Sequence, residues 1–226
     1  MNEVDDNECF VKLIQYMGDD LSIVNAARVS MNKRSSEMRS KDERLIKYLF
    51  EHEHTSPFRH QYLTFHIKAP LFVLRQWQKH QVGCSFNEQS FRYVSPQKKV
   101  WKPSEWRCKP VDTIKQGSSV PVPDIIAQEV NKLYEDNVEA IIKTYDKLLE
   151  LGICKEQARM ILPLSTITEV WWTASLQATL HFLDLRLEKT AQKEIQFYAQ
   201  KVAQITKSKY PIAFKVWQER NALCGY

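Results

Sequence analysis

Polar residues of several chemical types are concentrated between Arg75 and Tyr93. In the helix that we predict over 71–82, cationic and amide groups recur at four-residue spacing and would line adjacent strips of one surface. Short polar side chains then follow Gly83 in an expected turn-rich loop. Such a combination can hold a phosphate with cations and backbone amides, while amide and carboxylate groups orient a polar ring. The alternative is a solvated helix face followed by a polar turn. The helix residues are Arg75, Gln76, Lys79 and His80, and the loop residues are Ser85, Asn87, Glu88, Ser90 and Arg92.

Four of the six histidines fall between His52 and His66, which raises the question of a metal site. His52 and His54 would share one face of a strand but would diverge on a helix, and no Asp/Glu pattern of a zinc helix accompanies them. We therefore predict no metal site, and we assign these histidines to polar contacts around a cofactor. We interpret His66 as a structural histidine of a strand.

The chain has five glycines, no two of them close together. The phosphate-binding patterns G-x-G-x-x-G and G-x-x-x-x-G-K-[ST] are therefore excluded, and any nucleotide would be held by side chains and helix ends. Five cysteines without a C-x-x-C pair indicate a reducing, cytoplasmic location and argue against a cysteine zinc site.

The net charge is +5, and residues 61–120 contribute ten basic and three acidic side chains. A basic chain suggests nucleic acid as a partner, but no run of Lys and Arg exceeds two and the aromatic residues are not interleaved with basic ones. No apolar run approaches 18 residues, which excludes a transmembrane helix. Residues 1–8 hold four acidic and no basic side chains, so we expect no signal or transit peptide. The charge pattern thus predicts neither a nucleic-acid nor a membrane partner.

The elements that must position these residues can be predicted from apolar periodicity. Helical spacing begins at Val11 and Ile14 and continues to a helix capped near Asp19 that ends by residue 30. A polar loop over 31–42 precedes a helix over 43–51. Strict alternation over 61–68 predicts a half-buried strand.

The second half of the chain is expected to be mostly helical. Five prolines between Pro96 and Pro123 indicate a long irregular segment, of the kind that often forms a functional loop or lid. A helix over 124–151 has an apolar face that includes Ile126 and Leu133, and Gly152 ends it. A short helix over 155–162 and two helices over 165–207, broken near residue 188, follow. We predict a single α/β (α+β) domain over residues 1–226.

Seven motifs occur in register across most of the chain and resemble the flavin-dependent thymidylate synthases (ThyX). They are A-A-R-V-S at 26–30, H-x-S-P-F-x-H at 54–60, F-H-I-K-A-P at 65–70, R-Q-W at 75–77, N-E-x-S-x-R-Y at 87–93, A-R-x-x-L-P-L at 158–164 and F-L-x-L-R at 182–186. The chain is identified as a member of this family on that basis. The resemblance implies a mostly antiparallel sheet and long C-terminal helices.

The resemblance also implies a reaction, the conversion of dUMP to dTMP. The family uses FAD, NADPH as the reductant and 5,10-methylenetetrahydrofolate as the carbon donor, and it acts as a homotetramer. It has no cysteine nucleophile, because reduced flavin mediates carbon transfer to carbon 5 of the pyrimidine and then hydride transfer.

Site residues are implied by matching the family's motifs position by position. The expected catalytic residues are Arg186, which would face the uracil and favour loss of its ring N–H proton, and Ser90, which would lie beside the reacting carbon. The expected dUMP-binding residues are Gln76, Lys79, Glu88, Gln89, Ser90, Phe91, Arg92, Arg159 and Arg186. The expected flavin-binding residues are His54, Ser56, Lys79, His80, Gln81, Glu88, Ser175, Gln177 and His181.

The chain departs from the family mainly at flavin-binding positions. The family has R-H-R and then seven residues before the serine, whereas Lys79-His80-Gln81 is followed by eight, which places one inserted residue near Gly83. The acidic residue expected after Pro-Phe is Arg59, and the family's Asn-x-Arg and following Asn correspond to Ser175, Gln177 and His181. These changes leave two alternatives open. One is a related flavoenzyme that modifies carbon 5 differently, for instance by hydroxymethylation, and the other is a nucleotide-binding protein without catalysis.

Overall fold

The structure is a computed structural model, which describes residues 9–97, 100–110 and 118–223. The chain divides into two compact units. Unit 1 comprises Lys68–Trp77, Asn87–Val170 and the described residues up to Phe10, and unit 2 comprises Val11–Ile67, Gln78–Phe86 and the described residues from Trp171 onward. Residues 1–8, which carry the acidic N-terminal pattern, lie outside the described residues, as do 98–99 and 111–117 of the predicted irregular segment.

Four antiparallel strands form one sheet in the order β1-β2-β4-β3. Their bounds are Phe10–Met17 for β1, Tyr62–Pro70 for β2, Cys84–Glu88 for β3 and Ile167–Ser175 for β4. The alternation that predicted β2 is confirmed, since Leu63, Phe65 and Ile67 are completely buried. The mixed α+β class with long C-terminal helices is confirmed as well.

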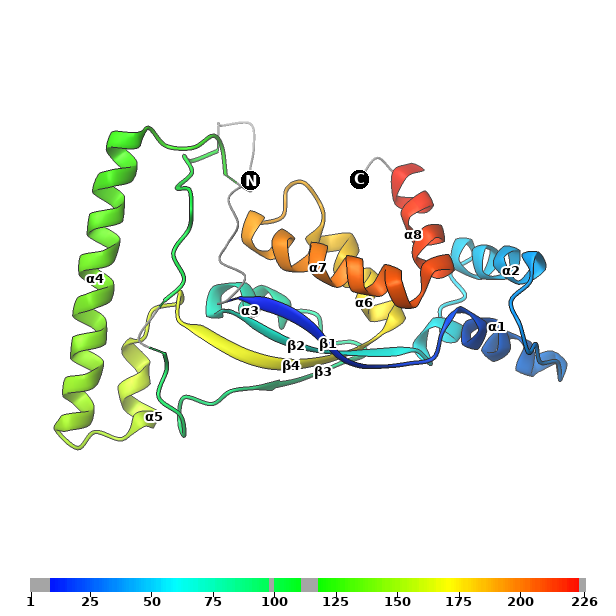
Figure 1. The fold of residues 1–226 in the computed structure, drawn as a ribbon, viewed down its shortest axis with the longest axis horizontal. Coiled ribbons are helices and arrows are strands. Elements are labelled where there is room, and N and C mark those ends of the chain that lie inside the picture. Colours follow the sequence, from blue (N-terminus) through cyan, green and yellow to red (C-terminus); the bar gives the residue numbers. More distant parts are fainter. Residues whose placement is uncertain (1–8, 98–99, 111–117, 224–226) are drawn as a thin grey trace. The chain divides into compact units, whose positions relative to one another are not determined.

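Unit 2 holds most of the helical elements of the described residues. They are α1 (Asp20–Arg28), η1 (Val29–Met31), α2 (Ser40–Glu51), η2 (Ser56–Arg59), α6 (Leu176–Arg186), α7 (Lys193–Lys209) and α8 (Pro211–Leu223). Helices α6 and α7 lie over one face of the strands of this unit (Figure 1). The Trp172 ring packs against Phe65 and Phe182 with ring centroids 5.5 and 5.2 Å apart, so this core joins β2, β4 and α6.

Two adjacent aspartates accept hydrogen bonds from backbone N–H groups at the starts of helices in unit 2. Asp19 caps α1 by accepting from the backbone N–H of Ser22 at 2.7 Å, as its predicted capping role requires. The buried Asp20 carboxylate accepts from the backbone N–H groups of Ile212 and Ala213, each at 2.9 Å, at the start of α8. Burial raises the pKa of Asp20, and these two N–H groups oppose that shift.

Unit 1 contains α3 (Leu71–Trp77), α4 (Asp124–Glu150), α5 (Lys155–Ala158) and η3 (Arg159–Ile161). Helix α4 packs against α5 and η3 (Figure 1), and Gly152, with φ of +86°, follows its end as predicted. Tyr145 of α4 is buried, whereas Ile126 and Leu133 are exposed, so the predicted inward face is wrong at these two positions.

The described residues of 96–123 form no helix, in agreement with the predicted irregular segment. Two stretches of it pair through backbone hydrogen bonds, with Cys108 N–H donating to Val120 O at 2.9 Å. The segment is fastened to α4 because the Trp106 indole donates to Asn131 at 2.8 Å and the Tyr134 hydroxyl donates to Trp101 O at 2.6 Å.

Three helical predictions are wrong. Val11 and Ile14 belong to strand β1, residues 167–175 form strand β4, and α3 ends at Trp77 instead of continuing to residue 82. Most residues of β4 are buried, so the strand lacks the alternation by which a strand is identified. The expected loop after Gly83 contains strand β3, α2 begins three residues earlier than expected, and helix α8 had not been predicted.

Candidate active site

A cavity of about 600 Å³ in unit 1 brings together five of the residues expected to bind dUMP. We call it the Ser90 pocket. Its lining comprises Leu71 from α3, Glu88, Gln89, Ser90 and Phe91 at and after the end of β3, and Glu156, Gln157, Arg159, Met160 and Leu162 from α5, η3 and the residue after them.

Backbone hydrogen bonds fix the position of Ser90. The N–H of Gln89 donates to Glu169 O at 2.8 Å, which ties the end of β3 to β4. The chain then turns tightly, because the N–H groups of Tyr93 and Val94 donate to Ser90 O at 3.0 and 3.1 Å. Phe91, only 6% exposed, anchors this turn in the core. The serine hydroxyl is thus held at the wall of the cavity by backbone geometry.

Charged groups of both signs surround the Ser90 pocket. Arg92 forms an ion pair with Glu156 at 3.4 Å, and the Nε of Arg159 donates to Glu156 O at 3.3 Å. The Arg92–Glu156 pair is exposed and therefore contributes little to stability, so an anionic ligand can compete for the guanidinium at small cost. The pocket offers guanidinium groups for a phosphate, and carboxylate and amide groups for the edge of a polar ring.

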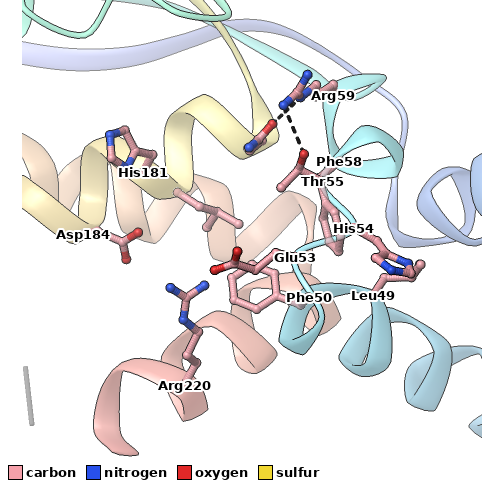
Figure 2. A pocket seen from close by; sticks show the side chains of 12 residues that line it. Leu49, Phe50, Glu53, His54, Thr55, Phe58, Arg59, His181, Asp184 and Arg220 are labelled. Atoms are coloured by element: carbon pink, nitrogen blue, oxygen red, sulfur yellow. Dashed lines mark hydrogen bonds between the residues drawn. The ribbon is translucent and has the colours of Figure 1, made fainter. Parts of the chain in front are cut away.

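A second cavity, of about 370 Å³, lies in unit 2, and we call it the Arg59 pocket (Figure 2). It is assembled from α2, the segment after it, η2, α6 and α8. The lining residues are Leu49, Phe50, Glu53, His54, Thr55, Phe58, Arg59, Gln177, Leu180, His181, Asp184 and Arg220. Three of them, His54, Gln177 and His181, belong to the predicted flavin set.

Arg59 is fastened at one end of this pocket. Its Nε donates to the Gln177 side-chain oxygen at 2.5 Å, and its Nη2 donates to the Thr55 hydroxyl at 3.0 Å (Figure 2). Within the described part of the chain, no carboxylate pairs with this guanidinium. Its positive charge is therefore available to an anionic group in the pocket.

The other end of the Arg59 pocket carries charges of both signs. Asp184 accepts from the Trp217 indole at 2.6 Å and from the Asn221 amide at 3.0 Å, so its carboxylate serves to hold α8 against α6. The Arg220 guanidinium lies 5.4 Å from the centre of the Phe50 ring and is directed into the same part of the cavity as Glu53 and Asp184 (Figure 2).

A third group consists of Arg186 and His80, which lie outside the linings of both pockets, and His181, which also lines the Arg59 pocket. The Nε of Arg186 donates to the Nε2 of His80 at 3.0 Å, and the rings of His80 and His181 lie 6.0 Å apart. The pKa of His80 is lowered to about 4, chiefly by burial and further by the charges of Arg186 and His181. Burial also lowers the pKa of Arg186, but a guanidinium remains protonated at neutral pH.

The remaining predicted residues are not gathered into either pocket. Gln76 lies on α3, while Lys79 and Gln81 are exposed in the turn between α3 and β3. Ser56 begins η2, and the Ser175 hydroxyl caps α6 by accepting from the N–H of Ala178 at 3.2 Å. For Ser175 the structure thus shows a helix-capping role.

Sequence reasoning missed several residues that line the cavities. Thr55 lies inside the H-x-S-P-F-x-H motif, which could have drawn attention to it, whereas Arg59 of the same motif was noted only as a departure from the family. Arg220 and Glu156 belong to no motif, and only the packing of α8 and α5 brings them to the pockets.

Of the histidines between 52 and 66, His52 and His54 lie near each other, with ring centroids 6.4 Å apart. His52 stacks on Tyr48 with ring centroids 4.1 Å apart, and its Nδ1 lies 2.9 Å from Tyr48 O. Across the described ranges, no group of three or more His, Cys, Asp or Glu side chains is arranged to hold a metal ion. None of the described helices is both long and apolar enough to cross a bilayer.

A serine, carboxylates and guanidinium groups lining one cavity, together with an aromatic and cationic lining in another, are typical of an enzyme that binds nucleotides. The family model described as "Thymidylate synthase complementing protein" matches residues 12–212. The chain therefore belongs to the flavin-dependent thymidylate synthase family.

Individual relatives and solved structures agree with this assignment. The chain is 41% identical to the flavin-dependent thymidylate synthase of Thermosipho melanesiensis over 212 residues, which cover 94% of this chain and 91% of the relative. It is also 41% identical to that of Thermus thermophilus, over 93% of this chain and 76% of the relative. The crystal structure of the UMP/dUMP methylase PolB from Streptomyces cacaoi bound with 5-Br dUMP is similar, with a TM-score of 0.84 and 30% identity over 93% of this chain and 95% of PolB.

The family name implies a flavin cofactor, and the residues of the Arg59 pocket fit such a group. Phe50, Phe58 and Leu180 provide apolar walls for a planar ring, and Arg59 carries a charge that no described carboxylate neutralises. The Gln177 oxygen is engaged by Arg59, which leaves its amide nitrogen as a donor at the same end. An aromatic wall with a guanidinium and amide donors suits a flavin nucleotide, which combines a flat ring with phosphate.

Proposed function

We propose that this protein converts dUMP to dTMP with FAD as cofactor, NADPH as reductant and 5,10-methylenetetrahydrofolate as carbon donor, acting in the cytoplasm as a homotetramer of single-domain chains. The observation that best supports the substrate is the Ser90 pocket, which gathers Glu88, Gln89, Ser90, Phe91 and Arg159 around one cavity. Family membership supports the reaction and the flavin.

The residues of the Ser90 pocket divide the work of binding by their chemistry. Arg159 and Arg92 would bind the phosphate of dUMP through charge-assisted hydrogen bonds. Glu88 and Gln89 would orient the uracil edge, and Phe91 supports the turn that carries Ser90. Ser90 would then lie at the reacting carbon, where its hydroxyl can hydrogen-bond to the ring.

Arg186 supplies a charge that the chemistry can use. A guanidinium that stays protonated stabilises the pyrimidine after loss of its ring N–H proton, and the anionic ring is the better nucleophile at carbon 5. Arg59, Gln177, His54 and His181 would hold a flavin in the Arg59 pocket, where it would supply the reducing equivalents that turn the transferred carbon into a methyl group.

A second candidate is methylation of UMP, because the similar solved structures are of a UMP/dUMP methylase, one of them bound with 5-Br UMP. The two substrates differ by one hydroxyl, so the ability to exclude UMP depends on whether the site leaves a polar group unpaired or sterically blocked.

The test is incubation of the purified protein with dUMP, FAD, NADPH and methylenetetrahydrofolate, followed by mass analysis of the nucleotide. We expect dTMP. A hydroxymethyl product would show the alternative modification of carbon 5, and a methylated UMP in a parallel incubation would show the broader substrate range. A protein that retains no flavin and yields no product would contradict the enzymatic proposal and favour simple nucleotide binding.

A further inference from the structure

His80 is buried in a turn whose neighbouring residues face solvent. It is 8% exposed, whereas Lys79 and Gln81 on either side are exposed. Its ring packs edge-on against Phe182 of α6, with centroids 5.1 Å apart. One member of the Lys79-His80-Gln81 triplet thus points into unit 2, against the helix that carries Arg186.

The hydrogen bond between Arg186 and His80 has only one chemically possible direction. A guanidinium has five N–H donors and no acceptor, so the Nε2 of His80 must be the acceptor. His80 is therefore neutral, with its proton on Nδ1. Burial and the positive charge of Arg186 both favour the neutral form, in agreement with this assignment.

The contact also restricts which part of Arg186 His80 can hold. It uses Nε, the inner nitrogen of the guanidinium, and leaves its terminal nitrogens outside the contact. A hydrogen bond at Nε restricts the plane of the guanidinium and the direction of its fork.

We propose that His80 is a positioning residue that acts as a neutral acceptor and orients the Arg186 guanidinium toward the pyrimidine, an inference that rests on the function proposed above. Its effect on the reaction is indirect. Misplacing a group that stabilises the reacting ring by about 1 Å lowers the rate by on the order of 10²-fold. Replacing the acceptor should therefore lower kcat much more than it raises KM.

Two substitutions separate the acceptor from the volume of the ring. His80→Leu fills the space but removes the acceptor, whereas His80→Gln retains a side-chain oxygen that Arg186 can reach. At saturating FAD, we expect His80→Leu to lower kcat by on the order of 10²-fold, with the circular dichroism spectrum unchanged, and His80→Gln to restore most of the activity. Gln204→Leu, at an exposed residue of α7 outside both pockets, is the control and should have little effect.

A readout that needs no turnover tests the contact itself. In flavin-loaded protein labelled with 15N-arginine, the Nε–H signal of Arg186, assigned by its loss in Arg186→Lys, should exchange slowly with solvent. It should shift and exchange faster in His80→Leu and stay close to its wild-type position in His80→Gln. This signal reports on the hydrogen bond even if the proposed reaction were wrong.

A double substitution excludes a merely structural role. Because His80 acts through Arg186, adding His80→Leu to Arg186→Lys should cost far less activity than it costs in the wild-type background. An equal loss in both backgrounds, or an unchanged Arg186 signal in His80→Leu, would overturn the proposal. If His80→Leu failed to fold, a loss of activity and of slow exchange in His80→Gln would overturn it as well.

Discussion

The Ser90 pocket and the Arg59 pocket are built in different ways. Four lining residues of the Ser90 pocket are consecutive in the chain, from Glu88 to Phe91, and a backbone turn holds them together. In the Arg59 pocket the longest run of consecutive lining residues is three, from Glu53 to Thr55, and the lining is spread over residues 49–59, residues 177–184 and Arg220. In a pocket lined by consecutive residues, substitutions fall within a single sequence motif. In a pocket lined by several elements, a substitution on one element can be compensated by a substitution on another.

Arg59 and Gln177 illustrate such compensation. In the family resemblance, the position of Arg59 is acidic and that of Gln177 is an arginine. In this chain the positive charge has moved from α6 to η2, and the two side chains are hydrogen-bonded at 2.5 Å. If each position is compared with the family separately, two flavin-binding positions differ. If the two positions are compared together, this chain still has one guanidinium, that of Arg59, and one hydrogen-bond partner for it, Gln177.

The largest expected effect concerns Arg186, which lies on α6, the helix that also lines the Arg59 pocket. Arg186→Ala should lower kcat/KM by on the order of 10³-fold, because it removes the charge that stabilises the anionic pyrimidine. Flavin absorbance of the purified variant should be retained. Steady-state kinetics and the visible spectrum measure the two effects. Loss of flavin together with activity would show that Arg186 is needed for cofactor binding. The flavin site would then include residues outside the lining of the Arg59 pocket.

The folding stability of the protein should decrease in acid because of His80, which packs against α6. The folded pKa of His80 is about 4, below its ordinary value of 6.5, so between these values the unfolded chain binds a proton that the folded chain does not. Stability contributed by neutral His80 is present above pH 6.5 and falls as pH decreases toward 4, by up to about 3 kcal/mol. Denaturant unfolding at pH 7 and at pH 4.5 measures this loss. His80→Leu should reduce it, and an identical loss in this variant would assign the acid sensitivity to other groups.

Lys79 tests whether the nucleotide site extends beyond the consecutive residues of the Ser90 pocket. Lys79→Ala should weaken dUMP binding by about 1.5–3 kcal/mol if the ammonium meets the phosphate. Titration calorimetry with dUMP measures the change, and Lys189→Ala at another exposed lysine is the control. Unchanged affinity would restrict the nucleotide site to the residues around the cavity.

Arg59 tests compensation directly. Arg59→Ala should weaken flavin binding by about 1.5–3 kcal/mol, since a charged hydrogen-bonding group is lost, while dUMP affinity stays the same. Equilibrium titration of flavin fluorescence measures it. The double variant Arg59→Glu, Gln177→Arg returns the pair to the arrangement implied by the family and should recover most of the affinity. If Arg59→Glu alone bound flavin as tightly as the wild type, the relocated charge would have no role.

The sequence predicted the parts of the molecule whose signals are local. Strand β2 alternates strictly, and α4 lies between Pro123 and Gly152, so both were predicted within two residues. Strand β4 was missed because it is buried at most positions, and β1 because Val11 and Ile14 happen to be three apart. Both segments are strands because they pair with β2 in the sheet, and the periodicity of a single segment does not reveal such pairing.

The same distinction applies to the site. The motif around Ser90 brings Glu88, Gln89, Ser90 and Phe91 to one cavity because they are neighbours in the chain. Arg220 reaches the Arg59 pocket only through the packing of α8, and Arg186 meets His80 across 106 positions of the sequence. No local sequence pattern predicts contacts between such distant residues. The departures from the family at Arg59 and Gln177 did, however, point to the pocket that Arg220 lines.

The smallest expected effect concerns Gly83, close to the inserted residue. Gly83 has φ of +73°, and its carbonyl accepts from the N–H of Ser175 at 3.0 Å, which ties the turn before β3 to the start of α6. A Cβ at this position would lie 3.0 Å from the Ser175 hydroxyl and 3.3 Å from Ala178 Cβ. Gly83→Ala should therefore lower the free energy of unfolding by about 1–2 kcal/mol for the left-handed backbone and further for these contacts, measured by denaturant unfolding.

Gly152 is the matched control, because it has φ of +86° and an added Cβ would meet no atom within 4 Å. Gly152→Ala carries only the cost of the left-handed backbone, so the difference between the two variants isolates the contact with Ser175 and Ala178. If the contact matters, Gly83→Ala should be the more destabilising of the two and should also weaken flavin binding through Gln177, two residues beyond Ser175. Equal destabilisation with unchanged flavin affinity would mean that the insertion alters the chain length before β3 without any effect on the assembled pocket.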